Sequence, residues 1–203
     1  KIVVAFLAPA VRVSLGELFK MEPGINLEKE IVTALKRLGF NYVFDTTFGA
    51  DLTVMEEASE LVNRIKTSKN LPMFTSCCPS WVKFCEMFYP EYLDNLSTCK
   101  SPISMMGSVI NNYFCKINNL KREDIISIVI VPCTSKKMEI LKYNDIDLAI
   151  TTRELAKYLK KEKINLAKLK NSSYNSLLGK GSSGGIIFGT SGGVMEATLR
   201  EVY

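Results

Sequence analysis

The chain has 203 residues, a formal net charge of +5, and 47% apolar and 23% charged residues. This composition is typical of a globular protein with a packed core, and it excludes the collagen-like, disordered and disulfide-scaffold classes. The chain contains no histidine, so it cannot carry a Ser/His/Asp or Cys/His triad or a histidine-ligated zinc ion, and its chemistry must use other side chains.

Strands are predicted where short runs rich in β-branched residues lie between helical patterns. These runs cover residues 2–7, 42–45, 73–76, 125–131 and 148–151. The first run, followed by Ala8-Pro9-Ala10, has an outward likeness to a secretory signal, but its β-branched content and the proline favour a buried strand. Strands that alternate with helices predict an α/β fold with largely parallel sheets flanked by helices.

Helices are predicted from apolar residues spaced three or four positions apart. They are expected at residues 27–38, 54–65, 81–88, 103–114 and 194–202. A capping box formed by Thr151 and Glu154 predicts the start of one more helix. Asp51 or Thr53 is the expected cap of the helix at 54–65. An Asn- and Lys-rich turn near Lys121 predicts a boundary between two lobes, 1–120 and 121–203.

The cysteines indicate the cellular compartment of the protein, and the lysines indicate its possible binding partners. The length makes disulfides unnecessary and no C-x-x-C occurs, so we expect reduced thiols and a cytoplasmic location, or an anaerobic organelle. No apolar run approaches the ~20 residues of a membrane helix. The lysines between 157 and 170 form either a solvated helix face or a docking patch for an acidic partner. They lack the interleaved aromatic residues of a nucleic-acid site.

Two glycine-rich segments match known motifs without their usual context. Residues 179–184 match G-x-G-x-x-G but precede the apolar run 186–188, whereas a dinucleotide site requires the motif to follow a strand. Residues 189–193 match G-x-S-x-G between a strand-like run and a helix, but the absence of histidine removes the usual base. Close backbone packing at a helix entry is the better interpretation of these glycines.

Two cysteine motifs lie at predicted strand ends. Thr75-Ser76-Cys77-Cys78-Pro79 leads into a helix, and Pro132-Cys133 follows the most apolar strand. Helix N-termini at such positions lower the pKa of a thiol and stabilise the anionic sulfur that iron requires. Lys136, three residues after Cys133, could offer ammonium donors to an anionic ligand. Spacing alone leaves two alternatives, structural thiols and metal ligands.

Together these motifs resemble the H-cluster domain of the FeFe-hydrogenases, and the resemblance covers nearly the whole chain. Further segments occur in family order: 8–12, 44–46, 55–57, 100–102, 151–155 and 188–197. The resemblance implies reversible reduction of protons to dihydrogen. It implies an H-cluster between the two lobes, in which a 4Fe-4S cluster joins through a cysteine sulfur to a diiron unit with carbon monoxide, cyanide and dithiolate ligands.

The resemblance also implies residue roles. Cys78 and Cys133 match two of the four cysteines that ligate the 4Fe-4S cluster, and Cys77 matches the thiol that passes protons to the bridging amine. The relay from this thiol to the surface matches Ser97, Glu57 and Glu60. Lys136 matches the lysine that hydrogen-bonds one iron-bound cyanide, and Ala8-Pro9 matches the loop against the other cyanide.

The positions of the two glutamates support the relay independently. Glu57 and Glu60 are three residues apart on one predicted helix, so they face similarly. Glu57 borders the apolar stripe, where partial burial would raise its pKa towards useful proton exchange. The alternative is a solvated helix face, which is where glutamates usually lie. The other cysteines match no family ligand, and we expect core roles for Cys85, Cys99 and Cys115.

Several departures from the family pattern indicate a divergent subgroup. Ser80 stands where the family usually has glycine, Val131 where it commonly has methionine, and Ile103 where glutamine is frequent. The third cysteine motif, which supplies the other two ligands, has no counterpart before Tyr203. We therefore expect an N-terminal portion of a hydrogenase catalytic domain, C-terminally truncated, that cannot ligate a complete H-cluster and is inactive alone.

The resemblance implies partners and leaves two rival functions. Electrons would come from ferredoxin or accessory iron-sulfur domains, and dedicated maturation proteins would assemble the diiron unit; no nucleic acid or membrane is expected. One rival is a hydrogenase-like sensor without turnover, which the retained relay residues disfavour. The other is a non-enzymatic iron-sulfur assembly protein, which Lys136 and the complete Thr-Ser-Cys-Cys-Pro motif disfavour.

Overall fold

A computed structural model of the chain describes residues 1–177 and 181–203. These residues form two compact units, and each unit is built from two separate stretches of the chain. The first unit consists of Lys1–Thr46 and Gly107–Lys180, and the second of Thr47–Met106 and Gly181–Tyr203. The expected boundary near Lys121 differs from this division, because the strands before and after that residue pair in one sheet.

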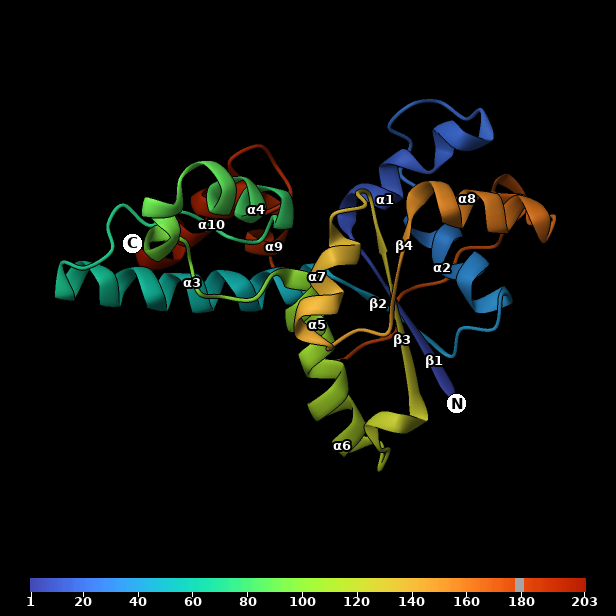
Figure 1. The fold of residues 1–203 in the computed structure, drawn as a ribbon. Helices are drawn as coiled ribbons and strands as arrows, with labels where there is room; N and C mark the ends of the chain where they lie inside the picture. Colours follow the sequence, from blue (N-terminus) through green and yellow to red (C-terminus); the bar gives the residue numbers. More distant parts are fainter. Residues whose placement is uncertain (178–180) are drawn as a thin grey trace. The chain divides into compact units, whose positions relative to one another are not determined.

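The first unit contains a four-stranded sheet, which agrees with the predicted α/β class (Figure 1). The strands are β1 (Ile2–Leu7), β2 (Tyr42–Asp45), β3 (Ile125–Val131) and β4 (Leu148–Thr151). All pairs are parallel and the order is β2-β1-β3-β4, with Ile2 opposite Ile125 and Leu7 opposite Ile130. Four of the five predicted strands are therefore confirmed.

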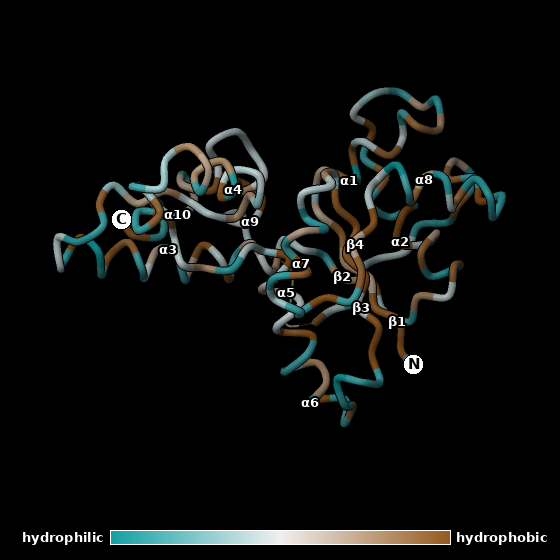
Figure 2. The backbone as a smooth tube through the Cα atoms, viewed as in Figure 1, coloured by the Kyte–Doolittle hydropathy of each residue, from teal (hydrophilic) through white to brown (hydrophobic). Residues whose placement is uncertain are grey.

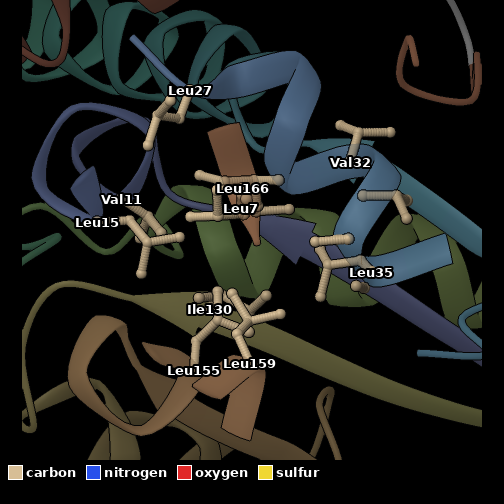
Figure 3. Packing of buried hydrophobic residues seen from close by; sticks show 14 of the residues in the cluster. Leu7, Val11, Leu15, Leu27, Val32, Leu35, Ile130, Leu155, Leu159 and Leu166 are labelled. Carbon is tan, nitrogen blue, oxygen red and sulfur yellow. The ribbon is translucent and has the colours of Figure 1, made fainter. Parts of the chain in front are cut away.

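One face of this sheet carries the main hydrophobic core. Alternate side chains of β1 point to this face, where they meet α1 (Pro9–Ser14), α2 (Glu28–Arg37) and α8 (Thr152–Lys161). Figure 3 shows Leu155 and Leu159 of α8 beside Ile130 of β3. The strands form a hydrophobic stretch of the backbone in Figure 2, as expected for parallel strands that are covered on both faces.

The opposite face of the sheet is covered by aromatic side chains. Phe44 points away from the main core because its neighbour Val43 points into it. Phe114 contacts both Tyr42 and Phe44 in edge-to-face geometry, with ring centroids 4.9 and 5.5 Å apart. The helix predicted at 103–114 comprises α5 (Pro102–Val109) and a π-helical turn, η3 (Ile110–Phe114), which continues as α6 (Cys115–Ile117).

Shorter elements complete the first unit. They are η1 (Gly16–Phe19), η4 (Arg122–Asp124), α7 (Lys136–Tyr143) and η5 (Leu166–Lys168). The predicted capping box of α8 is confirmed, because the Thr151 side chain accepts from Glu154 N–H at 3.2 Å while Glu154 accepts from Thr151 N–H at 2.7 Å.

The second unit is built from helices joined by irregular segments, and its described residues form no strand. Its elements are α3 (Thr47–Thr67), α4 (Pro79–Phe88), η2 (Pro90–Asn95), α9 (Ser183–Ile187), α10 (Gly193–Val202) and the first residues of α5. Helix α3 packs against α9 and α10. It is the longest helix of the described residues, and none of these helices combines the length and apolarity that a membrane crossing requires.

Three expectations for the second unit are wrong. Residues 73–76 form a single bridge between Phe74 and Leu96 instead of a strand, and Pro72, which precedes this segment, lacks the N–H that a longer ladder would need. The run 186–188 falls in and after α9, not in a strand. Neither Asp51 nor Thr53 caps α3, because the helix begins at Thr47 and contains both residues. The Asp51 carboxylate accepts from Ser182 and from the N–H of Gly185.

The second glycine motif packs as expected. Gly192 adopts φ +72° before α10 begins, a left-handed conformation that favours glycine. A Cβ at Gly193 would collide with the carbonyl oxygen of Ile187, so only glycine allows this approach of α9 and α10. Gly179 and Lys180, which belong to the G-x-G-x-x-G match, lie outside the described residues.

Candidate proton-relay and ligand sites

Helix α3 carries three ionisable side chains on one buried stripe. Glu57, Glu60 and Arg64 follow one another at spacings of three and four residues, so successive turns place them on the same side of the helix. Glu57 is 1% exposed and Arg64 is 7% exposed. Charged residues are rarely buried to this degree unless they are paired or functional.

Arg64 holds Glu60 as a carboxylate. Its Nε and Nη2 atoms donate to Glu60 Oε1 at 3.0 and 2.6 Å. The same guanidinium donates to the backbone carbonyls of Asn70, Asp94, Asn95 and Leu96. Burial would raise the pKa of Glu60, but the hydrogen bonds from Arg64, Thr98 N–H and Ser97 outweigh it and lower the pKa.

Ser97 lies between the two glutamates. Its hydroxyl donates to Glu60 Oε2 at 3.0 Å, and it is also close enough to Glu57 to lower the pKa of that carboxyl. The next two residues face Glu60 as well: Thr98 N–H donates at 3.0 Å and the Cys99 thiol at 3.4 Å to Oε2. Burial and the neighbouring Glu60 raise the pKa of Cys99 to about 12, so this thiol keeps its proton as a donor.

The pKa of Glu57 is shifted in the opposite direction to that of Glu60. Burial raises the pKa of Glu57, and the nearby Ser97, Thr198 and Ser76 only partly offset this effect. The predicted rise is therefore confirmed. The repulsion from Glu60 adds to it, so two carboxyl groups one turn apart are biased towards opposite protonation states. A hydroxyl that donates to one carboxyl group and lies near the other is suited to pass a proton between them.

The cysteine pair of the second unit lies beside this network. Ser76, whose backbone hydrogen-bonds Glu57, immediately precedes Cys77. Cys77 and Cys78 line a cavity of about 500 Å³ in the same unit. The other lining residues are Met73, Phe74, Thr75, Trp81, Gly192, Val194 and Met195. The lining of the cavity around the two thiols is largely apolar.

A second candidate site lies at the carboxyl edge of the sheet in the first unit. β1 and β3 are neighbours, so the residues after them, Ala8-Pro9 and Cys133, follow adjacent strand ends. Ala8 N–H donates to the carbonyl of Ile130 at 2.9 Å, which joins the two ends. Ligand sites of open parallel sheets form at this edge.

Cys133 is exposed and suited to metal binding. Its sulfur lies 2.7 Å from Ser135 Oγ. Burial alone would raise the pKa of Cys133, but the Ser135 hydroxyl, the backbone N–H groups of Ser135 and Lys136 and the Lys136 charge together lower it. Lys136 itself pairs with the buried Glu139 at 2.6 Å, which holds the ammonium group next to the thiol-bearing turn.

The structure thus assigns the predicted residues to two groups. The second unit holds Cys77, Cys78, Glu57, Glu60 and Ser97, and the first unit holds Cys133, Lys136, Ala8 and Pro9. Within the residues that the structure describes, no three Cys, Asp or Glu side chains are arranged to hold a metal ion. The exposed thiols of Cys78 and Cys133 are nevertheless the soft donors that an iron-sulfur cluster uses.

Sequence reasoning missed three partners of the predicted relay residues, namely Arg64, Cys99 and Thr198. The i,i+4 spacing of Glu60 and Arg64 is a visible signal of an ion pair that could have been used. Cys99 gives no such signal, because only the fold turns its thiol towards Glu60. Thr198 is 141 positions from Glu57, so no local pattern connects them.

Comparison with known proteins identifies the class to which this architecture belongs. A model of the family described as iron only hydrogenase large subunit, C-terminal domain, matches residues 1–203. The chain therefore belongs to the iron hydrogenase family. Iron hydrogenase 1 of Clostridium pasteurianum is 48% identical over 99% of this chain, and the periplasmic Fe hydrogenase large subunit of Nitratidesulfovibrio vulgaris is 44% identical over 98%.

Solved structures agree with this assignment. The apo FeFe-hydrogenase of Chlamydomonas reinhardtii covers the whole chain with a TM-score of 0.88 and 41% identity. The chain spans 36% and 50% of the two hydrogenases above and 53% of the solved chain. More distant relatives include cytosolic iron-sulfur assembly component 3 of Bos taurus, 30% identical over 99% of this chain and 46% of that protein.

Proposed function

We propose that this chain is the part of an FeFe-hydrogenase that carries the proton relay and two ligands of an H-cluster, in a protein that reversibly reduces protons to dihydrogen. Cys78 and Cys133 would hold the 4Fe-4S cluster, with Lys136 and Ala8-Pro9 near the cyanide ligands. The H-cluster, when bound, supplies the electrons and the iron centre at which protons are reduced. The relay of Cys77, Glu57, Ser97 and Glu60 supplies the protons.

The observation that carries this proposal is the pair of carboxyl groups on α3 with Ser97 beside them. Glu57 is biased towards holding a proton by burial, and Glu60 is biased towards the carboxylate by Arg64. Ser97 can accept a proton from one carboxyl group while its own proton goes to the other, and rotation of the hydroxyl then restores the starting arrangement. Cys77 at the cavity is the end of this path in the proposal.

The electron donor and the location remain parts of the same proposal. The exposed face of α8 carries three lysines, Lys157, Lys160 and Lys161, which suit a docking surface for an acidic carrier such as ferredoxin. Accessory iron-sulfur domains are the other electron source, and maturation proteins would supply the diiron unit. We propose a cytoplasmic location or an anaerobic organelle, although one relative is periplasmic by name.

The test is dihydrogen evolution by the matured full-length protein and its Cys77→Ala and Glu57→Gln variants. Loss of a positioned proton-transfer group should lower turnover by about 100-fold or more. Glu56→Gln is the matched control, because Glu56 is the exposed neighbour of Glu57 and should leave turnover unchanged. Infrared bands of iron-bound carbon monoxide and cyanide should persist in all variants.

Three outcomes would contradict the proposal. Unchanged turnover in both relay variants would refute the relay. Intact infrared bands without dihydrogen evolution in the unaltered protein would favour the sensor, because a sensor binds the cluster without turning over protons. Absence of the bands after maturation would favour an iron-sulfur assembly role, as in the Bos taurus relative.

A further inference from the structure

Thr198 is a buried hydroxyl in contact with the relay. It lies on α10, is 0% exposed, and its Oγ1 is 3.3 Å from Glu57 Oε2. The same oxygen is 2.9 Å from the carbonyl oxygen of Val194, one turn earlier on its own helix. Both acceptors are therefore within reach of one hydroxyl group.

A hydroxyl has one proton to donate and can accept as well. When Glu57 is a carboxylate, Thr198 can donate to Oε2 and leave the Val194 carbonyl with its helical hydrogen bond. When Glu57 carries a proton on Oε2, Thr198 can donate to Val194 and accept from Glu57. The hydrogen bond between the two side chains then persists in both states, with its direction reversed.

We propose that Thr198 is a positioning residue that solvates both protonation states of Glu57 by rotation of its hydroxyl. This inference rests on the proposed relay function and extends it from α3 to α10. No bond between heavy atoms changes: the relay proton moves on or off Glu57, and the Thr198 proton turns between Oε2 and the Val194 carbonyl. A buried carboxyl group without such a partner would lose a hydrogen bond at each proton transfer.

The groups around Glu57 favour Thr198 for this role. The charged group nearest to Glu57 on α3 is Glu60, and Glu60 already forms an ion pair with Arg64. The segment beyond Ser97 presents Cys99, whose thiol donates to Glu60, and Ser76 presents its backbone beside Cys77. Helix α9 has no ionisable residue, and on α10 Glu196 and Arg200 pair with each other in solvent at 2.7 Å.

The test compares Thr198→Val and Thr198→Ser in the full-length protein free of the iron-sulfur cofactor. Infrared spectra as a function of pH give the carbonyl stretch of protonated Glu57 and its pKa, with Glu57→Gln used to assign the band. Thr198→Val should move the band to higher frequency, because protonated Glu57 loses its acceptor, and should raise the pKa, because the carboxylate loses a donor. Thr198→Ser should restore both values.

Thr53→Val is the matched control. Thr53 is also buried, and its Oγ1 is likewise 3.1 Å from a carbonyl one turn back, that of Gly49, and 3.1 Å from the Lys100 carbonyl. It touches no carboxylate in either bond, so its loss should leave the Glu57 band and pKa unchanged. Thr198→Ala replaces Thr198→Val if the valine variant does not fold.

Each result decides the inference. An unmoved band in Thr198→Val would overturn it, because Thr198 would then serve α10 alone. A raised pKa with an unmoved band would overturn it as well, since the hydroxyl would serve the carboxylate only. In the matured enzyme, turnover should fall about 3- to 10-fold in Thr198→Val and recover in Thr198→Ser. The infrared measurement does not require dihydrogen evolution. Failure of the proposed function can therefore be distinguished from failure of the Thr198 inference.

Discussion

The two units of the chain place their polar groups in opposite ways. In the first unit the buried residues of the sheet are mostly apolar, with Ser127 of β3 as an exception, and the candidate residues Ala8-Pro9 and Cys133 follow the strand ends. In the second unit Glu57 and Arg64 are buried among helices, where charged groups reduce stability unless they are paired. The first unit is thus mainly an apolar support with its candidate residues at one edge, whereas in the second the candidate residues Glu57 and Glu60 lie on one helix beside the buried Arg64.

The largest effect is expected at Arg64. Arg64→Leu leaves the largely buried Glu60 without its ion pair and four carbonyls without a donor, so the free energy of unfolding should fall by about 4 kcal/mol. Chemical denaturation measures this loss. Arg200→Leu is the control, because its pair with Glu196 is exposed and should contribute less than about 1 kcal/mol.

A double variant sharpens this prediction. If the loss comes from an unpaired buried charge, Glu60→Gln added to Arg64→Leu should recover part of the stability. A double variant that is less stable than Arg64→Leu would show that Glu60 contributes through contacts other than its charge pair.

A smaller loss is expected in the apolar core of the first unit. Leu155 of α8 is 1% exposed and packs in the main core, so Leu155→Ala should cost about 3 kcal/mol by leaving a cavity. Leu141→Ala in the same unit is the control, since that side chain is mostly exposed and its loss should cost less than about 0.5 kcal/mol. Equal losses in the two variants would contradict the core assignment.

The smallest effect concerns the capping box of α8. The bonds from Lys137 and Thr151 lower the pKa of Glu154 to about 2, and its carboxylate stabilises the folded state. Glu154→Gln should reduce stability at neutral pH by about 0.5–1 kcal/mol. Because the folded pKa is the lower one, this contribution is present above the ordinary pKa of 4.5 and is lost as pH falls towards 2.

Denaturation at several pH values measures this difference. The gap between the original protein and Glu154→Gln should close on acidification, whereas Glu22→Gln, at an exposed loop position, should show no gap at any pH. A gap that persists at pH 2 would show that Glu154 acts by packing and not by charge.

Much of the first unit could be predicted from the sequence, because buried parallel strands give short apolar runs and α8 has both an amphipathic stripe and a capping box. Residues 73–76 carry the same local signal but form one bridge, since strand pairing depends on partners that local composition does not reveal. Burial of Glu57 was predictable from its place beside the apolar stripe. Its contact with Thr198 was not, because it joins segments 141 positions apart.

The pairing of β1 with β3 has a consequence for synthesis on the ribosome. Ile2 pairs with Ile125, so the first strand is made long before its central partner. At ~5–20 residues per second, the 123 positions between them take roughly 6–25 s to translate. Once β2 has been made, β1 has a partner on one side, and its other backbone edge still waits for β3 as an unpaired template. The nascent chain should therefore depend on chaperone cover until β3 has left the exit tunnel.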